Sequence, residues 1–394
     1  MSTSVEQSKP RDLHSENTSI IVDADAEKKL VRTIDLYLMP SIFILYLFSY
    51  MDRSNIGLAK IAGMEEDLHL TSHQYYTAVI VWVIGYTISA VPSKKNEQSK
   101  RFIIFLTAGI LSGAFGGVIS GAITSTLDGA YGIRGWRWLF IVEGVTTTGV
   151  SIIVHWTLLD YPHSSRGLSP EERILAQQRL IEDGIADQDD SKNQNISIFI
   201  LLLQAISHWR TWILIPGYMA ILGASAISYF YPTLINDMGY TATAAQYMTA
   251  PLYIASLAAA IPICWFADRN PHGRGRLLVG SMIVGMVFFA FTAGIRNSTA
   301  RYLFLCFINM ALWTGSALAL SFTTTALASV TRDVRAIMLA WMSGVSALAQ
   351  LYGSALFPAE DSPAYVVGFS VFAATFAVGA VCFGIADVLF KRYP

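Results

Sequence analysis

Long apolar runs dominate this chain and limit the folds that it can adopt. Ten of them, each about twenty residues long, are separated by short polar stretches. A helix of about 20 residues crosses a hydrocarbon core of ~30 Å, and helices satisfy their own backbone hydrogen bonds in lipid. Only 14% of the residues are charged, compared with roughly 25% in soluble domains. The sequence therefore predicts an all-α membrane protein.

The predicted spans divide into two bundles. They lie at 36–58, 74–93, 102–123, 137–159, 209–235, 244–266, 277–295, 302–327, 336–357 and 365–390. The expected regions are a cytosolic N-terminal tail (1–35), a bundle of four spans (36–160), a cytosolic linker (161–208) and a bundle of six spans (209–394). Within the linker, Ser169 followed by Glu172 predicts the start of an amphipathic helix.

The distribution of basic residues predicts the topology. With spans alternating between the two sides, the segments on the N-terminal side hold 21 Lys and Arg residues and the opposite loops hold 5. The positive-inside rule then places both termini in the cytosol. The net charge of −1 gives no reason to expect a nucleic-acid partner. No phosphate-binding loop, metal-ligand spacing or catalytic constellation is found, so we expect neither a cofactor nor an enzyme.

Charged and polar residues within the first span are candidates for function. Asp52, Arg53 and Asn55 lie in an apolar run, and ionisable groups at membrane depth are costly unless they are paired or face a polar cavity. At 100° per residue, Arg53 shares a stripe with Tyr46 and Tyr50, whereas Asp52 projects toward a neighbouring helix. The alternative is that these residues only end the span, because Arg53 lies ~26 Å along a helix that begins at position 36.

Three further patterns supply candidate residues. Glycines at four-residue spacing in the third span predict close helix packing, and they suit a helix that moves against its partner. The loop after the sixth span combines one acid with three arginines, which indicates a structural latch or ordinary positive-inside charge. Aromatic residues within the spans are candidates for a substrate pocket or for anchors and core residues. These candidates are Gly109, Gly113, Gly117, Gly121, Asp268, Arg269, Arg274, Arg276, Tyr76, Tyr229, Trp313 and Trp341.

Several motifs together resemble the fungal allantoate permease group of the major facilitator transporters, which are anion:cation symporters. These motifs are Asp52–Gly63, Gly85-Tyr86, Val91–Ser93, Gly135–Phe140, Glu143-Gly144, Tyr231–Ile235, Met238–Tyr240, Asp268-Arg269 and Phe357–Asp361. The resemblance implies a major facilitator helical bundle with twelve helices in two halves. It also implies import of a small organic anion, such as nicotinate or allantoate, together with protons. The leading hypothesis is therefore a plasma-membrane importer, with Arg53 as the anion anchor and Asp52 as a candidate proton site.

The division into four and six spans departs from that family pattern. In the family, the segment ending at Ser93 closes helix 2 and the glycine-rich segment is helix 5, but here only Lys94–Arg101 separates them. We therefore expect helices 3 and 4 to be absent, a loss of roughly fifty or more residues. The acid that relatives carry on helix 4 for proton coupling has no counterpart. The alternative function is a shortened, transport-deficient or regulatory membrane protein.

Overall fold

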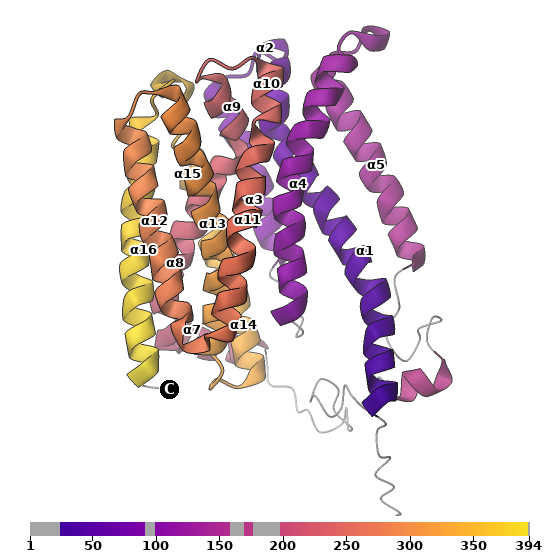
Figure 1. Cartoon of the computed structure of the whole chain (residues 1–394), viewed down its shortest axis with the longest axis vertical. Coiled ribbons are helices and arrows are strands. Elements are labelled where there is room, and N and C mark those ends of the chain that lie inside the picture. Colours follow the sequence, from indigo (N-terminus) through magenta and orange to yellow (C-terminus); the bar gives the residue numbers. More distant parts are fainter. Residues whose placement is uncertain (1–23, 91–98, 158–168, 176–197, 393–394) are drawn as a thin grey trace, which may run out of the picture. The chain divides into compact units, whose positions relative to one another are not determined.

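All regular elements in the described part of this chain are helical (Figure 1). The computed structural model describes residues 24–90, 99–157, 169–175 and 198–392. Most of the expected N-terminal tail, the first five residues of the 94–101 junction and most of the expected linker lie outside these residues.

The helices have the following bounds. The long ones are α1 (Ala24–Ala59), α3 (Ser72–Ala90), α4 (Ser99–Thr126), α5 (Gly135–Thr157), α7 (Ile198–Ser207), α8 (Trp209–Ser225), α11 (Thr249–Arg269), α12 (Arg274–Gly294), α13 (Ser298–Ala326), α14 (Arg332–Ala347) and α16 (Val366–Arg392). The short ones are α2 (Glu65–Asp67), α9 (Tyr231–Asn236), α10 (Ala242–Tyr247), α15 (Ala349–Ser354), the π-helical turn η1 (Lys60–Met64) and the 3-10 turns η2 (Ala130–Gly132), η3 (Ala226–Tyr229), η4 (Pro271–Gly273) and η5 (Ala359–Asp361).

The predicted all-α membrane fold is confirmed. Nine helical segments in the described residues are long and apolar enough to cross a membrane. They coincide with nine of the ten predicted spans. The remaining predicted span, 74–93, corresponds to α3, which is described as far as Ala90.

Three predicted spans are each broken into shorter elements. The span 209–235 comprises α8, η3 and α9, and Pro232 begins α9 because proline fits the first helical turn, where its missing N–H is not needed. The span 244–266 comprises α10 and α11, and Thr241 caps α10 by accepting a hydrogen bond from the Ala244 N–H (3.3 Å). The span 336–357 comprises α14 and α15. Each of these predicted spans is therefore longer than the individual helices that form it.

The chain divides into two compact units, of which the smaller comprises Met1–Leu38 and Leu159–Gln188. In this unit the predicted helix start at Ser169 is confirmed. The Glu172 N–H donates to Ser169 Oγ (3.2 Å), and the Ser169 N–H donates to Glu172 Oε2 (3.0 Å). This reciprocal pair is a capping box.

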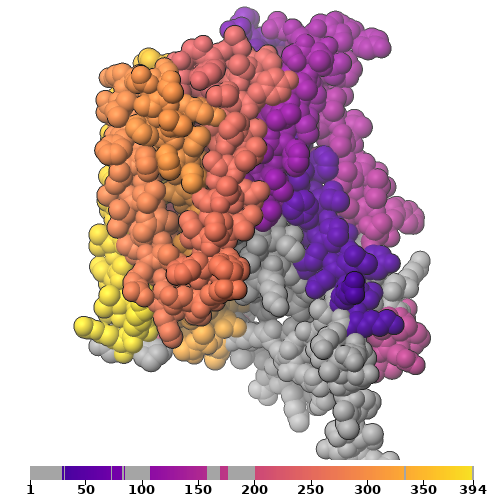
Figure 2. Space-filling model, viewed as in Figure 1, coloured from indigo at the N-terminus to yellow at the C-terminus, as the bar shows by residue number. Residues whose placement is uncertain are grey.

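The larger unit comprises Met39–Leu158 and Asp189–Pro394. Within it, α8, α11, α12, α13 and α16 pack against one another, α4 packs on α10 and α11, and α3 packs on α14 and α15. The side chains of α11, α12 and α13 form a continuous surface on the visible face (Figure 2). Phe289, Phe372 and Phe376 are fully buried in its core, with ring centroids 5.2 and 5.4 Å apart.

Candidate functional site

A close approach between α1 and η3 positions the first candidate residue. A Cβ added to Gly57 would lie 3.1 Å from the carbonyl carbon of Tyr229, closer than ordinary van der Waals contact. Only glycine lets the two backbones come this near. Arg53 lies about one helical turn before Gly57 on the same face of α1. This close approach of the two backbones therefore brings the Arg53 side chain into contact with Tyr229.

The Arg53 guanidinium contacts residues from three elements. Its Nε donates a hydrogen bond to the Tyr229 hydroxyl, and its Nη2 donates to Gln350 Oε1 at 2.9 Å. Its central carbon lies 5.5 Å from the ring centroid of Tyr50 and 5.3 Å from that of Tyr229. A partly exposed guanidinium held between aromatic rings can present its planar fork to a carboxylate. This geometry suits the recognition of an organic anion.

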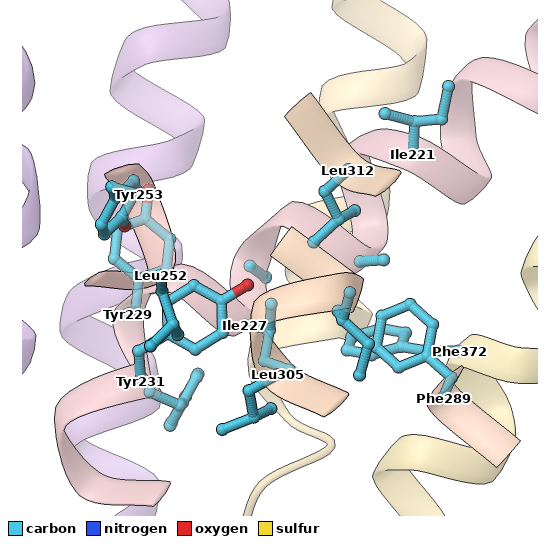
Figure 3. Close-up of a cluster of buried hydrophobic side chains, with 14 of the residues drawn as sticks. Ile221, Ile227, Tyr229, Tyr231, Leu252, Tyr253, Phe289, Leu305, Leu312 and Phe372 are labelled. Carbon is cyan, nitrogen blue, oxygen red and sulfur yellow. The ribbon is translucent and has the colours of Figure 1, made fainter. Parts of the chain in front are cut away.

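Further aromatic rings extend from this arginine. Tyr50 lies 6.2 Å from Tyr46 and 5.7 Å from Trp313, and Trp313 lies 6.4 Å from Tyr253, all measured between ring centroids. Figure 3 shows Tyr229 and Tyr253 together at one side of the buried hydrophobic cluster. Together these side chains form the Arg53 cluster, which comprises Tyr46, Tyr50, Arg53, Tyr229, Tyr253, Trp313 and Gln350. Rigid aromatic walls with a few polar groups are typical of small-molecule sites.

The glycine stripe of α4 faces these aromatic residues. A Cβ added to Gly109 would lie 2.9 Å from the Trp313 ring, and one added to Gly121 would lie 2.9 Å from the Tyr247 ring. Gly113 faces the Tyr253 ring and Gly117 faces Thr249 in the same way. The four glycines therefore accept side chains from α10, α11 and α13, which is the close packing that their spacing predicts.

The opposite side of α1 forms a different group with α5. Asn55 and Glu143 are 1% and 3% exposed, and the Asn55 Nδ2 donates a hydrogen bond to Glu143 Oε2. Asp52 is exposed and lies beside Thr147 of α5. The prediction that Asp52 turns toward a neighbouring helix while Arg53 faces another direction agrees with this arrangement. The helix continues past Arg53 to Ala59.

The structure places two predicted pocket residues in other surroundings. The Tyr76 hydroxyl donates to the Phe357 carbonyl (2.9 Å), and its ring packs with Phe230. Trp341 packs against the main hydrophobic core, and its indole N–H has no hydrogen-bond partner among the described residues. Their roles in substrate binding stay predictions.

Sequence reasoning missed three polar residues at these sites. Glu143 is an acid inside an apolar run, which is itself a signal for function in a membrane protein. Gln350 and Gln246 carry no charge, and only the tertiary structure reveals their partners. Gln246 Nε2 donates to the Leu58 carbonyl (3.1 Å), and its Oε1 accepts from Thr124 (2.8 Å).

The predicted latch lies in the loop between α11 and α12, and its role as a latch stays a prediction. Arg274 Nη2 pairs with Asp268 Oδ1 at 3.0 Å, and Arg274 Nη1 donates to Thr325 Oγ1 at 2.9 Å. The Arg269 guanidinium lies 3.7 Å from the Trp265 ring centroid. Arg276 is exposed. The latch connects α11 and α12 to the end of α13.

Comparison with known proteins assigns the family. The profile described as Major Facilitator Superfamily matches residues 93–358, which is more than half of the chain. This chain belongs to the Major Facilitator Superfamily. In the described residues, no group of three His, Cys, Asp or Glu side chains could hold a metal ion.

Fungal members of the superfamily are similar to this chain along most of its length. An uncharacterized transporter of Schizosaccharomyces pombe is 27% identical, with 76% of this chain and 74% of the relative covered. The high-affinity nicotinic acid transporter of Saccharomyces cerevisiae is 23% identical, with 93% and 78% covered. The xylose transporter XylE from E. coli, in a partially occluded inward open conformation, has a TM-score of 0.56 at 15% identity, with 90% of this chain and 97% of XylE covered. This likeness to XylE shows the fold alone.

Proposed function

We propose that this chain is a secondary transporter that imports a small organic anion together with protons. The observation that carries the proposal is the Arg53 cluster, in which α1, η3, α13 and α15 place a guanidinium among aromatic and amide groups. Arginine binds carboxylates through two parallel hydrogen bonds, and aromatic walls suit flat organic rings. A carboxylate, vitamin or ureide, such as nicotinate or allantoate, fits these groups.

Two observations support the anion and the subfamily. A relative with 93% of this chain aligned is a high-affinity nicotinic acid transporter. The motifs that resemble the allantoate permease group include Arg53, which forms the centre of the cluster. Nicotinate is therefore the first substrate to test, and allantoate is the second.

The contacts between the early and late spans support a defined state of the transport cycle. Arg53 with Gln350, Tyr76 with Phe357 and Gln246 with Leu58 all lie toward the end of the unit where α1 ends. With both termini in the cytosol, as the basic residues predict, this end faces outward. The proposal thus assigns the structure to a state closed toward the outside of the plasma membrane.

Alignment lengths support the absence of helices 3 and 4. The match to the Emericella nidulans transporter hxnP runs over 444 positions, but this chain supplies only 93% of its 394 residues, about 366. About 78 positions of the alignment are therefore gaps in this chain. Two membrane helices with their loops need roughly fifty or more residues. The deficit is large enough for the proposed helical hairpin.

The alternative function, a shortened and transport-deficient or regulatory membrane protein, also has an observation in its favour. Only 17% of the α5 span is buried, compared with 61% of the span that contains α8. Asp52 is exposed beside α5. An incompletely covered edge with an exposed acid is costly in lipid. Transport by the purified chain distinguishes the two functions.

The test measures uptake of labelled nicotinate into liposomes that contain the purified full chain. Arg53→Ala is expected to reduce initial uptake about tenfold to a hundredfold, because it removes charge-assisted hydrogen bonds worth ~1.5–3 kcal/mol. Arg53→Lys should restore little, since an ammonium cannot form the bidentate fork. Arg296→Ala is the matched control, because Arg296 is exposed in the loop before α13. Equal uptake by the Arg53→Ala and Arg296→Ala proteins would contradict the proposed anchor.

A further inference from the structure

The Asn55–Glu143 pair is a buried polar site that the Arg53 cluster does not use. Glu143 lies roughly 12 Å along α5 from Gly135, within a candidate membrane span. Its side chain and that of Asn55 are almost completely buried. A carboxyl group in this position requires a partner for its charge or a proton.

Two oxygen atoms of this pair have no hydrogen-bond donor among the described residues. The bond from Asn55 Nδ2 to Glu143 Oε2 uses one amide donor and one carboxyl oxygen. The other oxygens, Asn55 Oδ1 and Glu143 Oε1, are buried and have no partner among the described residues. Both are acceptors when the carboxyl group is ionised. Two buried acceptors without a donor are unfavourable.

One proton would satisfy both oxygens. A protonated Glu143 carries an O–H group that can donate to Asn55 Oδ1, while Asn55 Nδ2 continues to donate to Glu143 Oε2. The acid and the amide then form a ring with two hydrogen bonds. Ionisation of Glu143 removes the second bond and leaves a buried charge. The pair therefore has two states that differ by one proton.

The charged groups around Glu143 supply no compensating cation in the described part of the chain. Asp52 on α1 is the nearby charge, and it has the same sign as an ionised Glu143. Among the cations, Arg53 binds Tyr229 and Gln350, Lys60 of η1 pairs with Glu65 (3.5 Å), and Arg137 of α5 pairs with Asp67 (2.9 Å). On α4, the charged residues are Lys100 and Arg101 at its beginning, and on α5 His155 lies near the end.

We infer that the Asn55–Glu143 pair is a proton-binding site that couples proton movement to the Arg53 cluster. This inference rests on the proposed anion transport. It assigns the coupled proton to Glu143 of α5, because the acid that relatives carry on helix 4 has no counterpart in this chain. Asn55 and Arg53 are two residues apart on α1, so a change in the pair acts on the helix that carries the anion anchor. Release of the proton breaks the bond to Asn55 Oδ1, and its uptake re-forms that bond.

The first experiment needs no substrate. Infrared difference spectra of the purified full chain in lipid, recorded between acidic and alkaline pH, detect the C=O stretch of a protonated carboxyl group. The wild type should show a band for Glu143 that is absent from Glu143→Gln and shifted in Asn55→Ala. Glu360→Gln makes the same chemical change at an exposed loop residue and should leave that band unaltered. An identical carboxyl band in the wild type and Glu143→Gln would overturn the inference.

Transport assays supply the second measurement. Glutamine can form a ring with Asn55 that resembles the protonated pair, so Glu143→Gln should fold but lose the response to a pH gradient. Net nicotinate uptake driven by that gradient should fall at least about tenfold, and exchange of labelled for unlabelled nicotinate should fall less, because exchange needs no net proton movement. Full gradient-driven uptake by Glu143→Gln would overturn the inference. If the wild type takes up neither nicotinate nor allantoate, the proposed substrates fail, and the infrared band alone decides the proton site.

Discussion

The span that contains α8 and the span of α5 have similar hydropathy but very different surroundings. Their mean hydropathy is 1.4 in both cases, yet 61% of the first and 17% of the second are buried within the protein. The first is enclosed by α13, α14, α15 and α16, whereas α5 contacts mainly α4 and η1. Apolar composition therefore predicts that a helix spans the membrane. The packing of the neighbouring helices determines which of its side chains contact protein rather than lipid.

This difference bears on where polar groups can be placed. Near the end of the α8 span, Tyr229 binds Arg53 within the packed interface. On α5, Glu143 is buried against α1, whereas Thr146 and Thr148 are exposed. The candidate sites lie along α1, where the packed region meets the sparsely covered one. Variants on each side of α1 can test the comparison.

The largest effect is expected from a methyl group at the packed contact of α1. Gly57→Ala would force α1 away from the Tyr229 backbone, and overpacking of this kind costs ~1–3 kcal/mol or more. Gly144→Ala is the matched control on α5, because a Cβ there meets nothing within 4 Å. Alanine also favours a helix over glycine by about 1 kcal/mol, so the control should keep or gain stability.

Thermal unfolding of the purified variants, followed by tryptophan fluorescence, measures both effects. Gly57→Ala should unfold at a lower temperature than the wild type, whereas Gly144→Ala should not. Equal destabilisation by the two substitutions would show that α5 is as tightly enclosed as α1, and the contrast between the two regions would be wrong.

Most of the fold was predictable from the sequence, because the length of an apolar run is a property of neighbouring residues alone. Each predicted span has a helical counterpart, and the capping box at Ser169 formed from residues only three positions apart. The breaks were not predicted. Pro232 signals the start of α9, but the 3-10 turn before it, which lies against Gly57, has no comparable sequence signal.

The candidate site was predictable in part, for similar reasons. Helical periodicity placed Tyr46, Tyr50 and Arg53 on one face, and the structure brings them together with Tyr229 and Trp313. Their partners from distant elements, such as Gln350, could not be found, because a single amide in an apolar run has many possible neighbours. Glu143 could have been found from its charge alone, since acids are rare in membrane spans.

An intermediate effect is expected when the sparsely covered region is completed. Insertion of a helical hairpin of the length that the family pattern predicts, between Ala90 and Ser99, would supply new neighbours for the early spans. Because the inserted helices can cover exposed groups such as Asp52, nicotinate uptake per molecule should rise severalfold, consistent with a gain of about 1 kcal/mol. The measurement compares surface-normalised uptake by the two chains at two pH values.

A scrambled hairpin of equal length and hydropathy is the control for this insertion. It keeps the topology of every later span, because a pair of helices returns the chain to the same side. Equal uptake and equal pH dependence with the native-like hairpin and with none would show that the early spans function without further cover.

The smallest effect is expected within the packed region, at the latch between α11 and α12. Asp268 has a 53% exposed side chain, so its ion pair with Arg274 is screened by water and salt. Arg274 keeps two other partners when the acid is lost, the Ala267 carbonyl (3.2 Å) and Thr325 (2.9 Å). Asp268→Asn should therefore lower the free energy of unfolding by less than about 1 kcal/mol.

Arg274→Ala removes all three contacts and should lower the free energy of unfolding by more. Thermal unfolding at low and high salt measures both, and the small effect of Asp268→Asn should shrink further as salt rises. A loss in Asp268→Asn as large as that in Gly57→Ala would show that exposed charges, rather than close backbone contacts, stabilise the packed region.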